Sequence, residues 1–282
     1  SSVQFVTAGS SNVSFGLLDP CAYCANTPSI ALPVYVNGPF SQTSIFASDV
    51  LVRFPYSSGS YYPTGSNTPP VENVSLGGQV GSTWGLVYQS QYRKLLSAAF
   101  TKRFAAYGVG GPGAIYLMDP NAATPNGALF FDISTLLGAN AAGENTHPTG
   151  APNPYLDAAT YDAVGKSGLG DLEISDDGRT LYTVNLFSRT LLMMNIGMPA
   201  TAPISLAAPG AVPGPGQMGS FAIPSPCSNA DVDARPFGLG KYQGKIYVGG
   251  VCTGESNPLA AAAAVSESVN FSNTLSLYVY EF

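Results

Sequence analysis

The 282-residue sequence contains few charged residues. Asp, Glu, Lys and Arg make up 10% of it, against about 25% in an ordinary soluble domain. Only 11 residues are Lys or Arg, the formal net charge is −6, and no run of basic residues occurs. Binding to nucleic acid depends on clustered cations that neutralise phosphates, so we do not expect a nucleic acid among the partners.

Long hydrophobic runs are also absent. The longest uncharged stretch of small residues, 259–265, is too short to cross a hydrocarbon core of about 30 Å. The sequence therefore predicts no membrane span.

Histidine occurs once, as His147 in the polar segment 144–150. A lone histidine with no second His or Cys nearby is more often a surface residue than a ligand, so we expect His147 on the surface. The sequence contains no G-x-S-x-G motif and no recognisable Ser-His-Asp arrangement. It therefore gives no positive sign of a hydrolase.

Cysteine is scarce as well, with four in the chain. A Cys₄ zinc site would need a second C-x-x-C pair, and a thioredoxin-type motif would need its pair at a helix start, whereas residues 19–28 have a loop composition. We favour two structural disulfides in an oxidising compartment, Cys21 with Cys24 and Cys227 with Cys252. The second should tie the loop before one β-sheet to that sheet's second strand.

Glycine and proline are abundant, at 32 and 23 residues, which favours turns over helices. Hydrophobic residues make up 45% of the chain, too many for a disordered segment. Low charge with many Ser, Thr, Asn, Gly and Tyr is typical of secreted or cell-surface proteins, and we expect an extracellular location. No signal peptide is visible before the strand-like run 1–8, as in a mature chain.

Residues 168–196 show the basic structural unit most completely. They predict three short strands in succession, joined by a turn at Asp176, Asp177 and Gly178 and by another at Ser188 and Arg189. An Asp-Gly turn between two apolar, β-rich runs is a strong signal for a hairpin. Antiparallel strands joined this tightly form a meander, the unit of a propeller blade.

The pattern recurs along the chain, and it predicts an all-β fold of the β-propeller type. We expect one β-propeller domain over 1–282, with about four recognisable four-stranded antiparallel blades, incomplete or completed by another chain. The expected blades cover roughly 1–80, 81–137, 164–226 and 233–282. The expected long loops cover 138–160, 197–216 and 253–272.

Two stretches support a family resemblance. Residues 174–196 resemble the YVTN-type propeller repeat, with Thr183 in place of the usual Val. More widely, segments between 45 and 282 resemble the propeller region of large secreted bacterial surface proteins, which often also carry immunoglobulin-like repeat domains. The resemblance implies a propeller fold and no established activity. It also implies that the propeller of such proteins continues beyond the equivalent of Phe282.

When the second strands of the predicted blades are aligned with one another, Trp84, Asp171 and Arg235 fall at equivalent positions in the first strands of their blades. We expect these residues to line a central channel, where Asp171 and Arg235 form an ion pair or hold a polar ligand. Asp171, Asp176 and Asp177 are weak candidates for calcium ligands, because Ca²⁺ takes hard oxygen donors. The turn explains Asp176 and Asp177 without a metal, so we expect no cofactor, with calcium as the alternative.

The function favoured by the sequence is that of a non-enzymatic, secreted surface module with a structural, adhesive or fibre-forming role. Its partners would be other copies of itself, or surface proteins and glycans. The alternative is a lactonase-like or other metal-dependent hydrolytic propeller. A third hypothesis, a lectin-like propeller, needs exposed aromatic residues, which the 16 tyrosines offer without a placement. The run 1–8 would complete the last blade or pair with a neighbouring copy.

Overall fold

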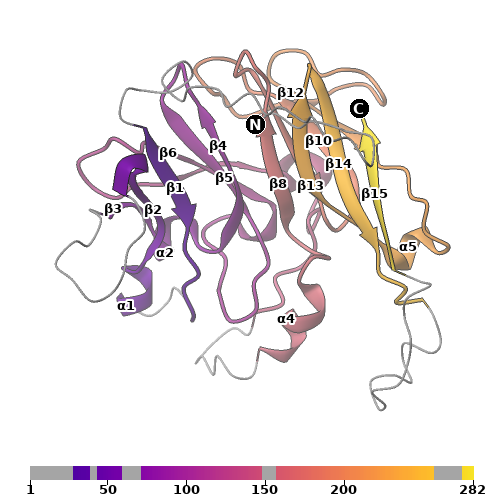
Figure 1. Ribbon diagram of the computed structural model, residues 1–282, viewed down its shortest axis with the longest axis horizontal. Coiled ribbons are helices and arrows are strands. Elements are labelled where there is room, and N and C mark those ends of the chain that lie inside the picture. The colour runs from indigo at the N-terminus through magenta and orange to yellow at the C-terminus, as the bar shows by residue number, and fades with distance from the viewer. Residues whose placement is uncertain (1–27, 39–42, 59–70, 148–156, 257–274) are drawn as a thin grey trace, which may run out of the picture.

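The fold is described from a computed structural model, which covers residues 28–38, 43–58, 71–147, 157–256 and 275–282 (Figure 1). These residues form 15 strands and a few short helical segments. The predicted all-β class is confirmed. The strands form four separate sheets that follow one another in chain order, and among the described residues these sheets do not close into a ring.

The first two sheets come from the N-terminal half. Sheet 1 has the order β1-β2-β3 and sheet 2 the order β4-β5-β6-β7. Their strands are β1 (Ser29–Pro33), β2 (Asp49–Pro55), β3 (Glu72–Leu76), β4 (Thr83–Gln89), β5 (Lys94–Ala99), β6 (Ala114–Met118) and β7 (Ala128–Asp132).

The other two sheets come from the C-terminal half. Sheet 3 has the order β8-β9-β10-β12-β11, where β11 pairs in parallel with β12, and sheet 4 the order β13-β14-β15. Their strands are β8 (Leu169–Ile174), β9 (Thr180–Asn185), β10 (Thr190–Asn195), β11 (Ser205–Leu206), β12 (Gln217–Ala222), β13 (Ala234–Tyr242), β14 (Lys245–Cys252) and β15 (Ser276–Glu281).

The helices are short, as the composition predicts. They are α1 (Thr43–Phe46), α2 (Gly77–Val80), α3 (Ser134–Leu137), α4 (Ala158–Ala163) and α5 (Ala230–Asp233), with 3₁₀ turns η2 (Tyr56–Ser58) and η3 (Gly111–Gly113). Within the described ranges, none has the length and apolar character needed to cross a membrane.

The predicted meander is present in sheet 3. Gly178 adopts a φ of 69°, which glycine tolerates without a steric penalty, and it closes the β8–β9 turn. The Asp177 carboxylate accepts hydrogen bonds from the Ser175 hydroxyl and the Arg179 amide, which fixes the same turn. Arg189, at a φ of 56°, lies in the β9–β10 turn.

Neighbouring sheets pack through their first strands. β4 of sheet 2 lies beside β8 of sheet 3, and β8 lies beside β13 of sheet 4. Gly85 makes the first approach feasible, because a Cβ there would come 2.7 Å from the Leu172 nitrogen and 2.9 Å from the Gly170 oxygen. A Cβ on Gly170 would likewise lie 2.8 Å from the Phe237 oxygen. The two glycines therefore set the spacing of the three strands.

The core is continuous across the sheet interfaces. One cluster joins sheets 2 and 3 through residues such as Leu96, Ile115, Leu181 and Met194, all fully buried. A second joins sheets 1 and 2, and a third joins sheets 3 and 4 through Val184 and Val248. Each sheet therefore stabilises its neighbour by burying apolar side chains.

Among the described residues, each of the two end sheets carries exposed apolar side chains on its outer face. On sheet 1, Ile30 and Leu32 of β1 are 40% and 50% exposed. On sheet 4, Leu277 and Val279 of β15 are 85% and 66% exposed. Sheets 1 and 4 lie at opposite ends of the row (Figure 1).

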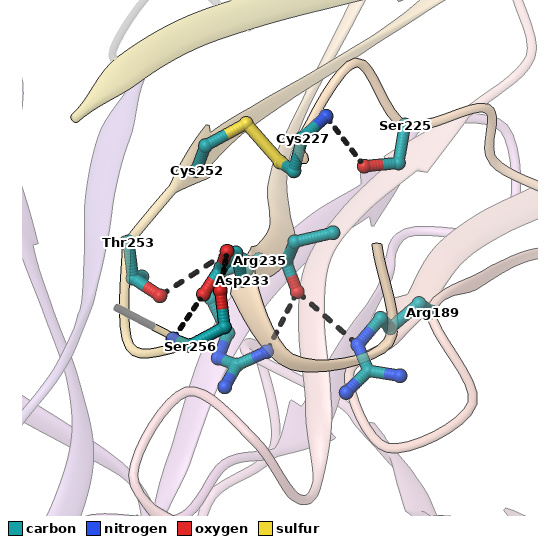
Figure 2. The surroundings of a disulfide bond; sticks show 9 residues. Arg189, Ser225, Cys227, Asp233, Arg235, Cys252, Thr253 and Ser256 are labelled. Atoms are coloured by element: carbon teal, nitrogen blue, oxygen red, sulfur yellow. Dashed lines mark hydrogen bonds between the residues drawn. A yellow bond between two sulfur atoms is a disulfide. The ribbon is translucent and has the colours of Figure 1, made fainter. Parts of the chain in front are cut away.

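The predicted disulfide between Cys227 and Cys252 is present, with a Cα–Cα distance of 5.4 Å (Figure 2). It joins the loop before β13 to the end of β14, the second strand of sheet 4. The other predicted pair, Cys21 with Cys24, and the predicted strand 1–8 lie outside the described residues.

Candidate functional site

The first of the predicted channel residues, Trp84, lies on β4 with 51% of its surface exposed. Its ring contacts Phe100 and Phe237, with both pairs of ring centroids 5.7 Å apart. Phe100 and Phe237 meet each other edge to face at 5.4 Å. Trp84, Phe100, which follows β5, and Phe237 therefore contact one another, and we call them the aromatic cluster.

Asp171 lies on β8, the strand that packs against both β4 and β13. Its carboxylate accepts hydrogen bonds from the Leu172 amide at 3.0 Å and, more weakly, from the Leu239 amide of β13 at 3.4 Å. Burial raises the pKa of Asp171, and the two amide hydrogen bonds oppose this rise. Glu173, two residues further along β8, also has a raised pKa because of burial.

Arg235 lies at the start of β13, away from Asp171. Its guanidinium donates to the Ala234 carbonyl and, at 3.0 Å, to the Glu255 carboxylate. Lys166 also contacts Glu255, at 2.8 Å. The expected ion pair between Asp171 and Arg235 is not formed: each has other partners. We define Lys166, Glu255 and Arg235 as the charged cluster.

Arg235 does not lie where the alignment of the repeated units placed it, because the first strands contain β-bulges that the sequence did not reveal. The pairing of β13 with β14 shifts register between Pro236 and Gly238, and that of β8 with β9 shifts between Leu169 and Leu172. A similar shift occurs in β4. As a result, Phe237 of β13, and not Arg235, contacts Trp84.

The charged cluster borders an open cavity of about 580 Å³ on sheet 4. Phe237, Val251, Leu277 and Val279 contribute apolar side chains to its lining. This cavity therefore lies on the uncovered face of the last sheet.

The weak calcium candidates have other partners in this structure. Asp176 forms an ion pair with Lys241 at 2.8 Å. Asp177 holds the β8–β9 turn, and its hydrogen bonds from Ser175 and Arg179 lower its pKa. Across the part of the chain that the structure describes, no group of three or more His, Cys, Asp or Glu side chains is placed to hold a metal ion.

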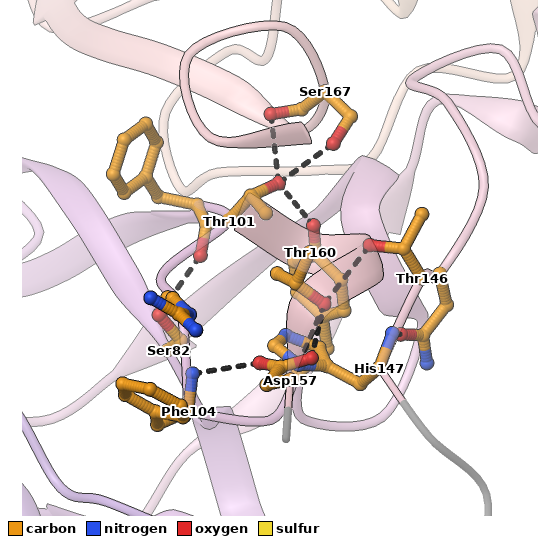
Figure 3. A network of polar contacts seen from close by, with 12 residues as sticks. Ser82, Thr101, Phe104, Thr146, His147, Asp157, Thr160 and Ser167 are labelled. Atoms are coloured by element: carbon orange, nitrogen blue, oxygen red, sulfur yellow. Dashed lines mark hydrogen bonds and ion pairs between the residues drawn. The ribbon is translucent and has the colours of Figure 1, made fainter. Parts of the chain in front are cut away.

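His147 contradicts the surface position expected for it. Its side chain is 9% exposed, and Nδ1 lies 3.0 Å from the Asp157 carboxylate (Figure 3). Asp157 precedes α4 and also accepts hydrogen bonds from the Phe104 amide at 2.7 Å and the Thr160 hydroxyl at 2.5 Å. The ring packs edge to face on Tyr107. No local sequence pattern indicates this burial, because it depends on contacts with Asp157 and Tyr107 in other segments of the chain.

The pKa values of this pair reflect its surroundings. Burial lowers the pKa of His147, against the opposing effect of Asp157. For Asp157 burial acts to raise the pKa, but the hydrogen bonds from Thr160 and Phe104 together with His147 outweigh it, and the pKa is lowered. The pair therefore acts as a buried link between α4, the 144–147 segment and the 101–107 segment.

Comparison with known proteins gives three relatives from Dictyostelium discoideum. Colossin-D is 28% identical over 86% of this chain, Colossin-A 27% over 83% and Colossin-B 23% over 98%. The matched regions make up 24%, 2% and 6% of these proteins, so the chain spans a quarter or less of the length of each.

No family model matches the chain, and no solved structure matches it. The resemblance to bacterial surface proteins remains a prediction.

Proposed function

We propose that this chain is a non-enzymatic structural module of a secreted or cell-surface protein, built on a propeller plan. In this proposal it assembles with other copies of itself through the uncovered faces of its end sheets. The observation that carries the proposal is the open apolar face of sheet 4, where Leu277 and Val279 are 85% and 66% exposed.

The face is built from alternate residues of β14 and β15. Val251 pairs with Leu277 and Gly249 with Val279, so these side chains share one face. The opposite face carries Val248, which is fully buried against sheet 3. Contiguous exposed apolar side chains of this kind mark interaction sites.

The other end of the molecule also carries exposed apolar side chains. Leu32 pairs with Val52 and Ile30 with Phe54 on the outer face of sheet 1, where Ile30 and Leu32 are exposed and Val52 is buried. Within the molecule, faces of this apolar kind are covered by the next sheet. A contact between sheet 4 of one copy and sheet 1 of the next would continue this arrangement, and a head-to-tail contact that does not close produces a filament.

Two further observations support the proposal. β4, β8 and β13 lie side by side while the later strands of each sheet lie further out, as in a propeller.

His147 and Asp157, a pair that resembles part of a catalytic site, are both used to hold the fold together. The hydrolytic alternative needs carboxylates or histidines from several first strands, but Asp171 and Glu173 both come from β8.

Sedimentation velocity tests the proposal. The wild-type protein is expected to self-associate with rising concentration, and Leu277→Lys to remain monomeric, because a charge would be buried in the contact. Ile204→Lys is a matched control, since Ile204 is 84% exposed but lies before β12 in sheet 3. A wild-type protein that stays monomeric, or equal loss in both variants, would contradict the proposal.

A further inference from the structure

A small cavity of about 180 Å³ lies between sheets 3 and 4. The β9–β10 turn and the chain after β12 border it from sheet 3, and the start of β13 and Tyr278 of β15 border it from sheet 4. Successive side chains of a strand point to opposite faces, so the Tyr278 side chain lies on the other face of β15 from Leu277 and Val279. It therefore points away from the surface proposed for self-assembly.

Arg189 supplies the positive charge of this cavity. Its Nε and Nη2 donate hydrogen bonds to the main-chain oxygens of Ala234 and Asp231. Arg235 donates to the same Ala234 oxygen at 2.8 Å, so the two guanidinium groups lie close together (Figure 2). The charge of Arg235 is paired with Glu255, whereas Arg189 forms no ion pair with any residue that the structure describes. Because a guanidinium carries five N–H donors, Arg189 has donors left for a ligand.

The Tyr278 hydroxyl lies within reach of these charges. Burial and Tyr280 raise the pKa of Tyr278, and the positive charges of Arg189 and Arg235 oppose the rise. Tyr278 is 8% exposed, and its hydroxyl is buried without a hydrogen-bond partner in the described part of the chain. A buried hydroxyl left unpaired is costly, so a ligand that accepts its proton would be stabilised.

Other hydroxyl groups of the lining also have unused protons. Ser225 Oγ accepts a hydrogen bond from the Cys227 amide at 3.2 Å, and no described residue accepts the Ser225 proton. The Ser188 and Thr190 hydroxyls bond each other at 2.8 Å, which uses the proton of one of them. The cavity lining therefore offers an excess of hydrogen-bond donors.

An excess of donors beside a positive charge favours an oxyanion as the ligand. Its oxygens accept several charge-assisted hydrogen bonds, whereas an apolar ligand would leave the donors unpaired. A cation would be repelled by Arg189. The lining contains one acidic residue, Asp231, which is exposed and meets Arg189 through its main-chain oxygen. Its charge weakens the positive potential but does not use the remaining donors of Arg189.

We propose that Arg189, Tyr278 and Ser225 form a binding site for a tetrahedral oxyanion, sulfate or phosphate, which accepts hydrogen bonds from the guanidinium and the two hydroxyls. The donors come from three elements around the cavity: the β9–β10 turn, β15 and the chain between β12 and α5. A tetrahedral anion presents oxygens in several directions, so it matches such donors better than a planar carboxylate does. The site does not rest on the proposed self-assembly and is tested independently of it.

Calorimetric titration of the full chain tests the site. Sodium sulfate and sodium phosphate are each added at constant ionic strength, with sodium acetate as the planar anion. We expect saturable binding of sulfate or phosphate and weaker binding of acetate. Galactose 6-sulfate then identifies the source of the anion. Tighter binding than that of inorganic sulfate assigns the site to a sulfated sugar, and equal or weaker binding assigns it to the free ion.

Two tyrosine variants separate binding from folding. Tyr278→Phe removes only the unpaired hydroxyl, so it should weaken anion binding roughly tenfold without lowering the melting temperature. Tyr280→Phe is the matched control, because Tyr280 lies on the same strand but outside the cavity lining. It should leave the affinity unchanged.

Two charge variants complete the test. Arg189→Gln should bind neither anion detectably, and thermal melts verify its folding because it also loses two contacts with the main chain. Asp231→Asn removes the one acidic side chain of the lining and should strengthen binding. No saturable signal with sulfate or phosphate, acetate binding as tight as either, or undiminished binding by folded Tyr278→Phe would overturn the proposal.

Discussion

The indole of Trp84 on β4 meets the phenyl ring of Phe237 on β13 edge to face, at a centroid distance of 5.7 Å. These strands belong to sheets 2 and 4, and β8 of sheet 3 packs against both. The contact therefore shows that β4, β8 and β13, the first strands of sheets 2, 3 and 4, lie close together. It also involves Trp84, one of the three residues that the sequence predicted to line a central channel.

Convergence of these strands should depend on Gly85. In Gly85→Ala the new methyl group would meet backbone atoms of Leu172 and Gly170 at less than 3 Å, and backbone cannot move aside cheaply. We expect unfolding free energy to fall by about 1–3 kcal/mol, as in overpacked cores. Gly240→Ala is the control, because open space surrounds that position. Urea denaturation measures both, and equal stability of the two variants would refute the close approach.

The Cys227–Cys252 disulfide should stabilise the last sheet by restricting the unfolded chain. Its two cysteines are 25 residues apart, and closing a loop of this length contributes on the order of 3 kcal/mol. Cys227→Ser with Cys252→Ser should lower the unfolding free energy by about that amount. Mass spectrometry of the unreduced protein verifies the bond. Two free thiols at these positions would also count against the proposed extracellular location.

The His147–Asp157 pair predicts how stability depends on pH. The folded-state pKa of His147 is lowered, so the unfolded chain takes up the proton first as pH falls through about 6.5. Stability should therefore decrease between about pH 7 and 5. The lowered pKa of Asp157 adds a further loss below about pH 4, the unfolded value of an aspartate.

His147→Gln separates these two effects. The variant should show a smaller slope of unfolding free energy against pH between about pH 7 and 5, while the loss at lower pH persists. Chemical denaturation at a series of pH values provides the measurement. A slope identical to that of the wild-type protein would show that His147 does not titrate with unfolding.

Much of the local structure was predictable from the sequence. Alternating apolar residues and turn residues predicted the strands of sheets 2 and 3. These features determine structure locally, over a few neighbouring residues. The 176–178 turn is an example, since Asp177 and Gly178 determine it locally. The Cys227–Cys252 bond was also predictable from the number and spacing of cysteines.

Contacts between distant segments were not predictable in this way. The burial of His147 depends on Asp157 and Tyr107, whose proximity is decided by tertiary packing. Phe237, and not the expected Arg235, lies beside Trp84 because of a β-bulge in β13. A bulge inserts an unpaired residue and so changes which side chain of the strand faces the adjacent sheet. Strand alignment without knowledge of the bulge therefore misplaced Arg235.

Crosslinking between copies tests the head-to-tail assembly most directly. Leu32→Cys and Leu277→Cys are prepared separately, each with Cys21→Ser and Cys24→Ser so that no other thiols interfere, and are then mixed under mild oxidation. We expect a disulfide-linked dimer between the two variants, because sheet 1 of one copy contacts sheet 4 of the next. Neither variant alone should crosslink. Absence of the mixed dimer, or linkage of Leu277→Cys with itself, would contradict the head-to-tail contact.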